Sequence, residues 1–197
     1  MATYKSIAYG NTGVLANASG EVLLSSVTAS SSATVDFTSS IDSTYKEYVF
    51  RFDNVHPASN AQLTVNFRDG GSDFDASKQS TAFNPYHQES GGSYDVIYRA
   101  AWDLANSTSD QIIAQELSNE ADASASGYLH LFDPSNTSHI KHFIGVTTYS
   151  QYIGSDASSF QVYYQGYCNT TTAIDGVRFK MSSGNIDAGT IKMYGII

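Results

Sequence analysis

Apolar and polar residues alternate along several segments of this chain, which is the pattern of a β-strand with one buried face. Two segments show it most clearly, 46–55 and 61–68. Their apolar positions are Tyr48, Phe50 and Phe52 in the first segment, and Leu63, Val65 and Phe67 in the second. Because side chains two residues apart on a strand share a face, we expect both segments to contribute to one hydrophobic core.

The same alternation predicts further strands between turn-forming residues. These are 21–28, 33–37, 94–102, 127–133, 139–149 and 160–168. In segment 94–102 the alternation places aromatic side chains and one valine on a single face, and we expect this face to belong to the core. Its residues are Tyr94, Val96, Tyr98 and Trp102.

Two hairpins are predicted where turn residues separate neighbouring strands. The first joins 127–133 to 139–149. The second closes the chain in residues 173–197, where the turn 182–185 contains Ser, Gly and Asn. The apolar positions of this second hairpin are Val177, Phe179 and Met181 on one strand, and Ile191, Met193 and Ile197 on the other.

Segment 105–126 is mostly polar around an apolar island at Ile112, Ile113 and Leu117. The island suits either a strand or a helical turn, and we favour a strand. About ten strands in one chain predict an all-β fold, a jelly-roll-like sandwich of two antiparallel sheets. A chain of 197 residues has the size of one ordinary domain.

Residues 1–20 differ from the rest of the chain. They are rich in Gly, Asn, Ala and Thr and contain only brief apolar patches. We expect them to form an extended N-terminal arm that becomes ordered by docking on another protein. The single jelly-roll-like domain then spans 21–197.

Composition narrows the range of partners. Lys and Arg number 10 against 19 Asp and Glu, a net charge of −9, which disfavours binding to nucleic acid phosphates. No apolar stretch approaches the roughly 18 residues of a membrane span, and the N-terminus lacks the apolar core of a signal peptide, so we predict no membrane insertion. A single cysteine, Cys168, excludes an internal disulfide.

One predicted strand offers a candidate binding face. In 160–168, Phe160, Val162 and Tyr164 fall on one side of the strand. The residues on the other side, predicted to point outward, are Gln161, Tyr163, Gln165 and Tyr167. Aromatic rings can stack on a sugar and amides can bind its hydroxyls, so this face suits glycan. A subunit interface is the other interpretation, and it is the commoner use of such a face.

Metal sites and cofactors are not expected. Asp69, Asp73 and Asp75 lie in a Gly-rich loop and could hold Ca²⁺, although such loops are mostly solvated turns. His130 and His142 would face each other across the first hairpin if Phe132 pairs with Ile140, but no third ligand is evident.

Catalytic motifs are equally scarce. We find no nucleophile elbow, Walker loop or HExxH motif, and we predict that Cys168 is buried and unreactive. We therefore expect no enzymatic activity.

Several segments resemble a known family. The ending 189–196 reads GTIKMYGI after a Ser-Gly-Asn turn, and 25–59, 69–75 and 127–145 match in the same order. Together they resemble the C-terminal part of β-rich, jelly-roll-like virion proteins of tailed bacteriophages, many of them tail-fibre proteins of marine phages. The resemblance spans roughly residue 25 to the end.

The resemblance implies a virion protein assembled in the host cytoplasm as a homotrimer. Together with the outward Gln and Tyr face of 160–168, this location leads us to expect a surface-displayed fibre or fibre-tip module that contacts host surface polysaccharide. The alternative is a capsid or tail decoration protein that docks on other virion proteins through residues 1–20. A polysaccharide depolymerase is a remote third hypothesis.

Overall fold

A computed structural model describes residues 20–153 and 156–197, so the predicted N-terminal arm lies outside the described residues except for its last position. The described residues form twelve strands and one short 3-10 helix, η1. In chain order these are β1 (Glu21–Thr28), β2 (Val35–Phe37), β3 (Glu47–Pro57), β4 (Ala61–Arg68), β5 (Lys78–Gln88), β6 (Tyr94–Tyr98), η1 (Ala100–Trp102), β7 (Gln111–Leu117), β8 (Ala125–Phe132), β9 (Lys141–Ile153), β10 (Asp156–Cys168), β11 (Gly176–Met181) and β12 (Ile186–Ile196).

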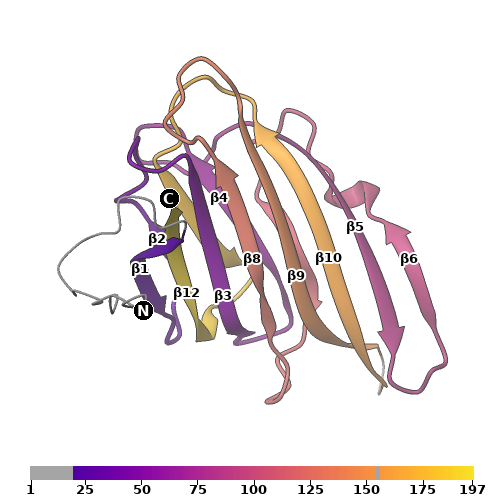
Figure 1. The fold of residues 1–197 in the computed structure, drawn as a ribbon. Helices are drawn as coiled ribbons and strands as arrows, with labels where there is room; N and C mark the ends of the chain where they lie inside the picture. The colour runs from indigo at the N-terminus through magenta and orange to yellow at the C-terminus, as the bar shows by residue number, and fades with distance from the viewer. Residues whose placement is uncertain (1–19, 154–155) are drawn as a thin grey trace, which may run out of the picture.

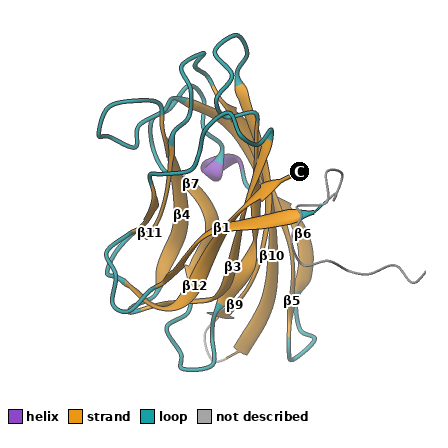
Figure 2. Ribbon diagram, turned by 60° about the vertical axis from the view of Figure 1, so that its left-hand side comes forward, coloured by secondary structure: helices purple, strands orange, loops and turns teal. Residues whose placement is uncertain are grey.

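The strands build a sandwich of two antiparallel sheets, as the alternation predicts (Figures 1 and 2). The large sheet has eight strands in the order β1-β12-β3-β8-β9-β10-β5-β6. The small sheet has four, in the order β2-β11-β4-β7. In Figure 1 the large sheet faces the viewer and runs from β1 to β6 across the picture.

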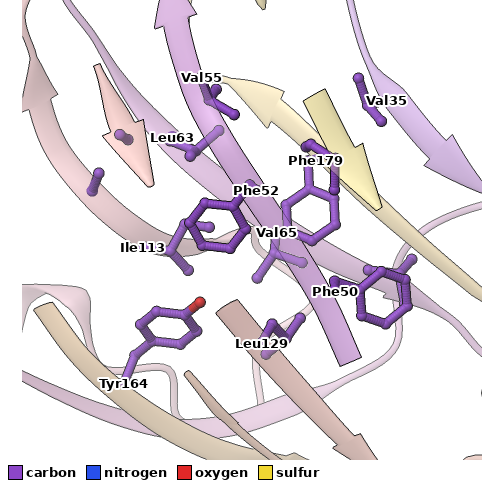
Figure 3. Packing of buried hydrophobic residues seen from close by; sticks show 14 of the residues in the cluster. Val35, Phe50, Phe52, Val55, Leu63, Val65, Ile113, Leu129, Tyr164 and Phe179 are labelled. Carbon is purple, nitrogen blue, oxygen red and sulfur yellow. The ribbon is translucent and has the colours of Figure 1, made fainter. Parts of the chain in front are cut away.

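A core of aromatic and aliphatic side chains fills the space between the sheets (Figure 3). Phe179 of β11 lies at its centre, with ring centroids 5.9 Å from Phe50 and 6.0 Å from Phe52 of the facing sheet. Tyr164 is also buried, and its hydroxyl donates to the carbonyl of Tyr128 at 3.1 Å. The Phe179 contacts join β11 of the small sheet to β3 of the large sheet, so the core holds the two sheets together.

The predicted inward positions of 46–55 and 61–68 are confirmed by burial, but Thr64 and Asn66, on the face expected to be exposed, are buried as well. The six predicted core residues of β3 and β4 are all buried. On this opposite side of β4, the Asn66 amide donates to the Asp110 carboxylate at 2.8 Å, and Thr64 donates to the Lys180 carbonyl at 3.0 Å. Hydrogen bonds therefore satisfy polar groups on the second covered face.

The predicted C-terminal hairpin is wrong. β11 pairs with β2 and β4 in the small sheet, whereas β12 pairs with β1 and β3 in the large sheet. The turn after Met181 carries the chain from one sheet to the other. Ile191 and Met193 are buried as expected, but Ile197 is exposed. For β11 and β12 the alternation predicted correctly which face is buried, but it did not predict which strands they pair with.

The predicted core face of 94–102 is wrong for its strand. Tyr94, Val96 and Tyr98 of β6 are exposed, and only Trp102, in the following 3-10 turn, is buried. β6 is the last strand of the large sheet and pairs with β5. The small sheet has half as many strands, so this end of the large sheet is not covered.

Three other predictions have clear outcomes. The apolar island forms strand β7, which confirms the favoured interpretation. β8 and β9 form the predicted hairpin, but His130 faces Ile144, two residues from the predicted register. His130 and His142 are therefore not directly opposite each other. Strand β5, which contains Pro85, was not predicted.

Candidate functional site

The exposed apolar side chains gather on the outer face of the large sheet. Register places on this face every large exposed hydrophobic residue among those described, except Ile197. They are Leu23, Phe83, Tyr94, Val96, Tyr98, Tyr128, Phe132, Ile144, Tyr152 and Tyr163. Apolar surface of this extent on one sheet face is typical of a binding surface.

The four predicted site residues of β10 all point to this face. Their neighbours Phe160, Val162 and Tyr164 are buried on the inner side, so the strand alternates as predicted. Tyr163 stacks on Phe83 of β5, with ring centroids 4.9 Å apart and planes 10° from parallel. The pair forms a flat aromatic platform on the surface.

A depression of about 610 Å³ lies beside this platform. Gln165 and Tyr167 line it, whereas Gln161 does not. Its other lining residues are Gln79, Ser80, Thr81, Phe132, His142, Phe143, Ile144 and Gly166. The ring of His142 meets that of Tyr167 edge-on at 5.8 Å. Amide, hydroxyl and aromatic groups thus border one hollow.

A smaller hollow of about 140 Å³ adjoins the first. Gln165, Thr81 and Ile144 line both hollows, so they are continuous along β5, β9 and β10. Phe83 and Tyr163 border the smaller one. The stacked pair therefore forms one wall of an extended site.

The described part of the outer face that surrounds the two hollows carries no charged side chains of Asp, Glu, Lys or Arg. In the described strands β5, β6, β8, β9 and β10, no outward position holds Asp, Glu, Lys or Arg. Charges appear farther along the sheet, where Arg51 pairs with Glu21 and Lys192 pairs with Asp53. An uncharged surface over five adjacent strands is notable in a chain of net charge −9.

A row of buried polar residues lies beneath the same strands. Cys168 pairs in register with Lys141 on one side and Lys78 on the other, and all three are fully buried. The amine of Lys141 donates to the Thr170 carbonyl at 2.9 Å. Burial raises the pKa of the Cys168 thiol to about 12, so the thiol is protonated at neutral pH and is not an activated nucleophile.

The predicted metal candidates do not assemble. Within residues 20–153 and 156–197, no group of three or more His, Cys, Asp or Glu is placed to hold a metal ion. In the acidic loop Asp73 and Asp75 are exposed, and Phe74 between them packs under the Arg178 guanidinium at 4.0 Å. The loop is fixed to the small sheet by this contact.

Part of the site was not predicted from the sequence. Gln79, Thr81 and Phe83 belong to β5, whose strand character the proline and polar residues concealed. Phe132 and Ile144 alternate outward on strands that were predicted, so counting every second residue would have found them.

Comparison with known proteins adds no family assignment. No family model matches the chain, and no curated protein matches it. Among the described residues, no helix is both long and apolar enough to span a bilayer.

Proposed function

We propose that this protein is a non-enzymatic component of a bacteriophage virion, displayed on the particle surface, whose large sheet contacts host surface glycan. The resemblance from residue 25 to the end supports the virion location. The two-sheet sandwich supports a rigid binding module, because a site on strands is held more precisely than one on loops.

The observation that carries the proposal is the pair of hollows beside the Phe83–Tyr163 stack. A sugar ring can lie flat on an exposed aromatic ring, and its hydroxyls can bond to nearby amide and hydroxyl groups. Gln165 and Thr81 line both hollows and provide such groups. The site has the aromatic and polar components that glycan recognition needs.

The charge pattern favours a neutral glycan. An acidic polysaccharide would meet a protein of net charge −9 without a compensating Lys or Arg on the five uncharged strands. A neutral polysaccharide meets no such repulsion. We therefore expect binding that depends little on salt.

Binding to purified polysaccharide of a susceptible host tests the proposal. The double variant Tyr163→Ala, Tyr167→Ala should weaken binding about 5- to 150-fold, because two aromatic contacts are each worth about 0.5–1.5 kcal/mol. Tyr152→Ala is a matched control, since Tyr152 is 38% exposed against 37% for Tyr163 and lies outside both hollows. Wild-type protein that binds no susceptible strain would refute the glycan role.

Immunogold labelling of intact particles tests the location. Label confined to the tail agrees with adhesion. Label scattered over the shell favours the decoration role instead, and unlabelled particles contradict a virion location altogether.

A further inference from the structure

Strand β6 forms an open edge of the large sheet. It ends the strand order, and its main contact is β5 (Figure 1). Tyr94, Val96 and Tyr98 are 72%, 66% and 62% exposed. These three side chains are among the most exposed large apolar groups of the described residues, and they form one row on the outer face.

The backbone of the same three residues also points away from β5. Gln88 N–H donates to the Ser93 carbonyl, and Arg99 N–H donates to the Ala82 carbonyl, both at 2.9 Å. Hydrogen-bonded pairs alternate with non-bonded pairs in an antiparallel ladder. Counting from these two bonds, Tyr94, Val96 and Tyr98 occupy the non-bonded positions, so their N–H and C=O groups face the open edge.

Few partners cover these outward backbone groups. Across the described segments of the chain, the one recorded hydrogen bond to them is from Val96 N–H to the carboxylate of Asp95, at 2.7 Å. Pro85 stands opposite Val96 in β5 and has no N–H, as suits a non-bonded position. The edge can therefore accept another strand at the loss of one local hydrogen bond.

The other three edges carry features that hinder strand pairing. β1 has a break in register between Leu23 and Ser25. β2 has only three residues. β7 shifts register twice against β4 and contains Glu116 at a φ of 49°. β6 pairs with β5 without interruption and contains no Lys or Pro.

The outward residues of β6, Tyr94, Val96 and Tyr98, read the same in both directions, whereas Asp95 and Ile97 exchange places. Antiparallel pairing around Val96 would set Val96 against the partner subunit's Val96, and Tyr94 against the partner subunit's Tyr98. Asp95 would face the partner subunit's Ile97, so the two carboxylates would not oppose each other. The outward N–H and C=O of Val96 would supply two hydrogen bonds at the centre.

We propose that two copies of the chain pair antiparallel along β6, around a twofold axis at Val96. The outer face of β6 carries no charge, and the one charged side chain of this strand, Asp95, lies on its inner side. Edge pairing continues the sheet and places both outer faces on the same side. The pairing goes beyond the proposed glycan role and does not depend on it. It is a twofold assembly and therefore differs from the homotrimer that the resemblance implies.

Sedimentation of the full chain tests the pairing, over concentrations from about 1 to 100 µM where small interfaces dissociate. We expect a species of twice the 21.3 kDa chain mass. Val96→Pro removes the outward N–H without removing a bond to β5, and Val96→Lys places charge on the axis. Each should weaken pairing at least tenfold, whereas Leu23→Lys, an exposed apolar position on the opposite edge, should leave it unchanged.

Amide hydrogen exchange gives an independent readout. Raising the protein concentration should protect the amides of Tyr94, Val96 and Tyr98, while those of Asp95 and Ile97 already bond to β5 and should not change. Circular dichroism checks that the Val96 variants fold. The two variants weaken pairing by different mechanisms, loss of an N–H in one and added charge in the other. A monomer at every concentration, or a dimer or trimer indifferent to both Val96 changes, would overturn the proposal.

Discussion

Replacing Lys78 should change how stability depends on pH. Lys78 is fully buried between the sheets, and its amine donates to the Asn66 side-chain carbonyl at 2.6 Å and to the Ala76 carbonyl at 2.7 Å. Burial lowers the pKa of this amine from 10.5 to about 8, against the opposing attraction of carboxylates such as Asp110. Folding therefore disfavours the charged form.

The direction and the magnitude of this pH dependence follow from the difference in proton binding between the folded and unfolded states. Between about pH 8 and pH 10.5 the unfolded chain holds a proton on Lys78 that the folded protein has released, so the free energy of unfolding rises with pH across this window. The gain is about 1 kcal/mol from pH 7 to pH 9 and about 2–3 kcal/mol by pH 10. Below pH 7 this contribution is flat.

Denaturant titration of wild type and Lys78→Met at pH 7, 8, 9 and 10 measures this effect. Wild type should gain stability relative to the variant as pH rises. The tyrosines titrate in both proteins, so their contributions largely cancel in the difference. The Cys168 thiol is coupled to Lys78, so both proteins carry Cys168→Ala to remove its titration. Leu63→Met, a buried change without a titratable group, should shift stability equally at every pH. A constant gap between wild type and Lys78→Met would refute the reasoning.

Two substitutions and one labelling experiment test the packing. Phe179→Ala removes a ring that lies 5.9 Å from Phe50 in the core, and it should lower the free energy of unfolding by about 3–5 kcal/mol in denaturant titration; a loss below about 1 kcal/mol would contradict its central position. Gly145→Ala directs a methyl group into the buried ring of Tyr164, so we expect a loss of about 1–3 kcal/mol, and an unchanged melting temperature would argue against this register. Cys168 is buried, so a thiol reagent should label it only as fast as the protein unfolds, in contrast to the immediate labelling of an accessible thiol.

Burial along single strands was predictable because the two-residue period matches the pleat. Phe50 in β3 and Phe160 in β10 are buried where the alternation places them. The period does not say which face a second sheet covers. In β6 the aromatic face is exposed because the small sheet does not extend over that end of the large sheet.

Strand pairing at the C-terminus could not be read from local sequence. A turn such as 182–185 suits a hairpin within one sheet and equally a crossing between two sheets. The choice depends on β3 and β4, which lie more than a hundred residues upstream and accept β12 and β11 respectively. Nothing within the last twenty-five residues indicates these competing partners.

Half of the candidate site was predictable and half was not. Tyr163, Gln165 and Tyr167 face outward as the alternation of β10 predicts. The other half comes from β5, where Pro85 normally argues against a strand. It is tolerated there because its ring nitrogen faces β10 at a gap in the pairing, where Gln161 and Val162 have no register partners on β5, and only the register reveals this gap.

The central claim is that the uncharged outer face of the large sheet is the recognition surface. Backbone amide NMR of the full chain, titrated with neutral surface polysaccharide from a susceptible host, tests it most directly. We expect shifts to cluster at Gln79, Thr81, Tyr163, Gln165 and Tyr167, which border the two hollows. Shifts confined to the small sheet, or an unchanged spectrum at saturating polysaccharide, would contradict the account.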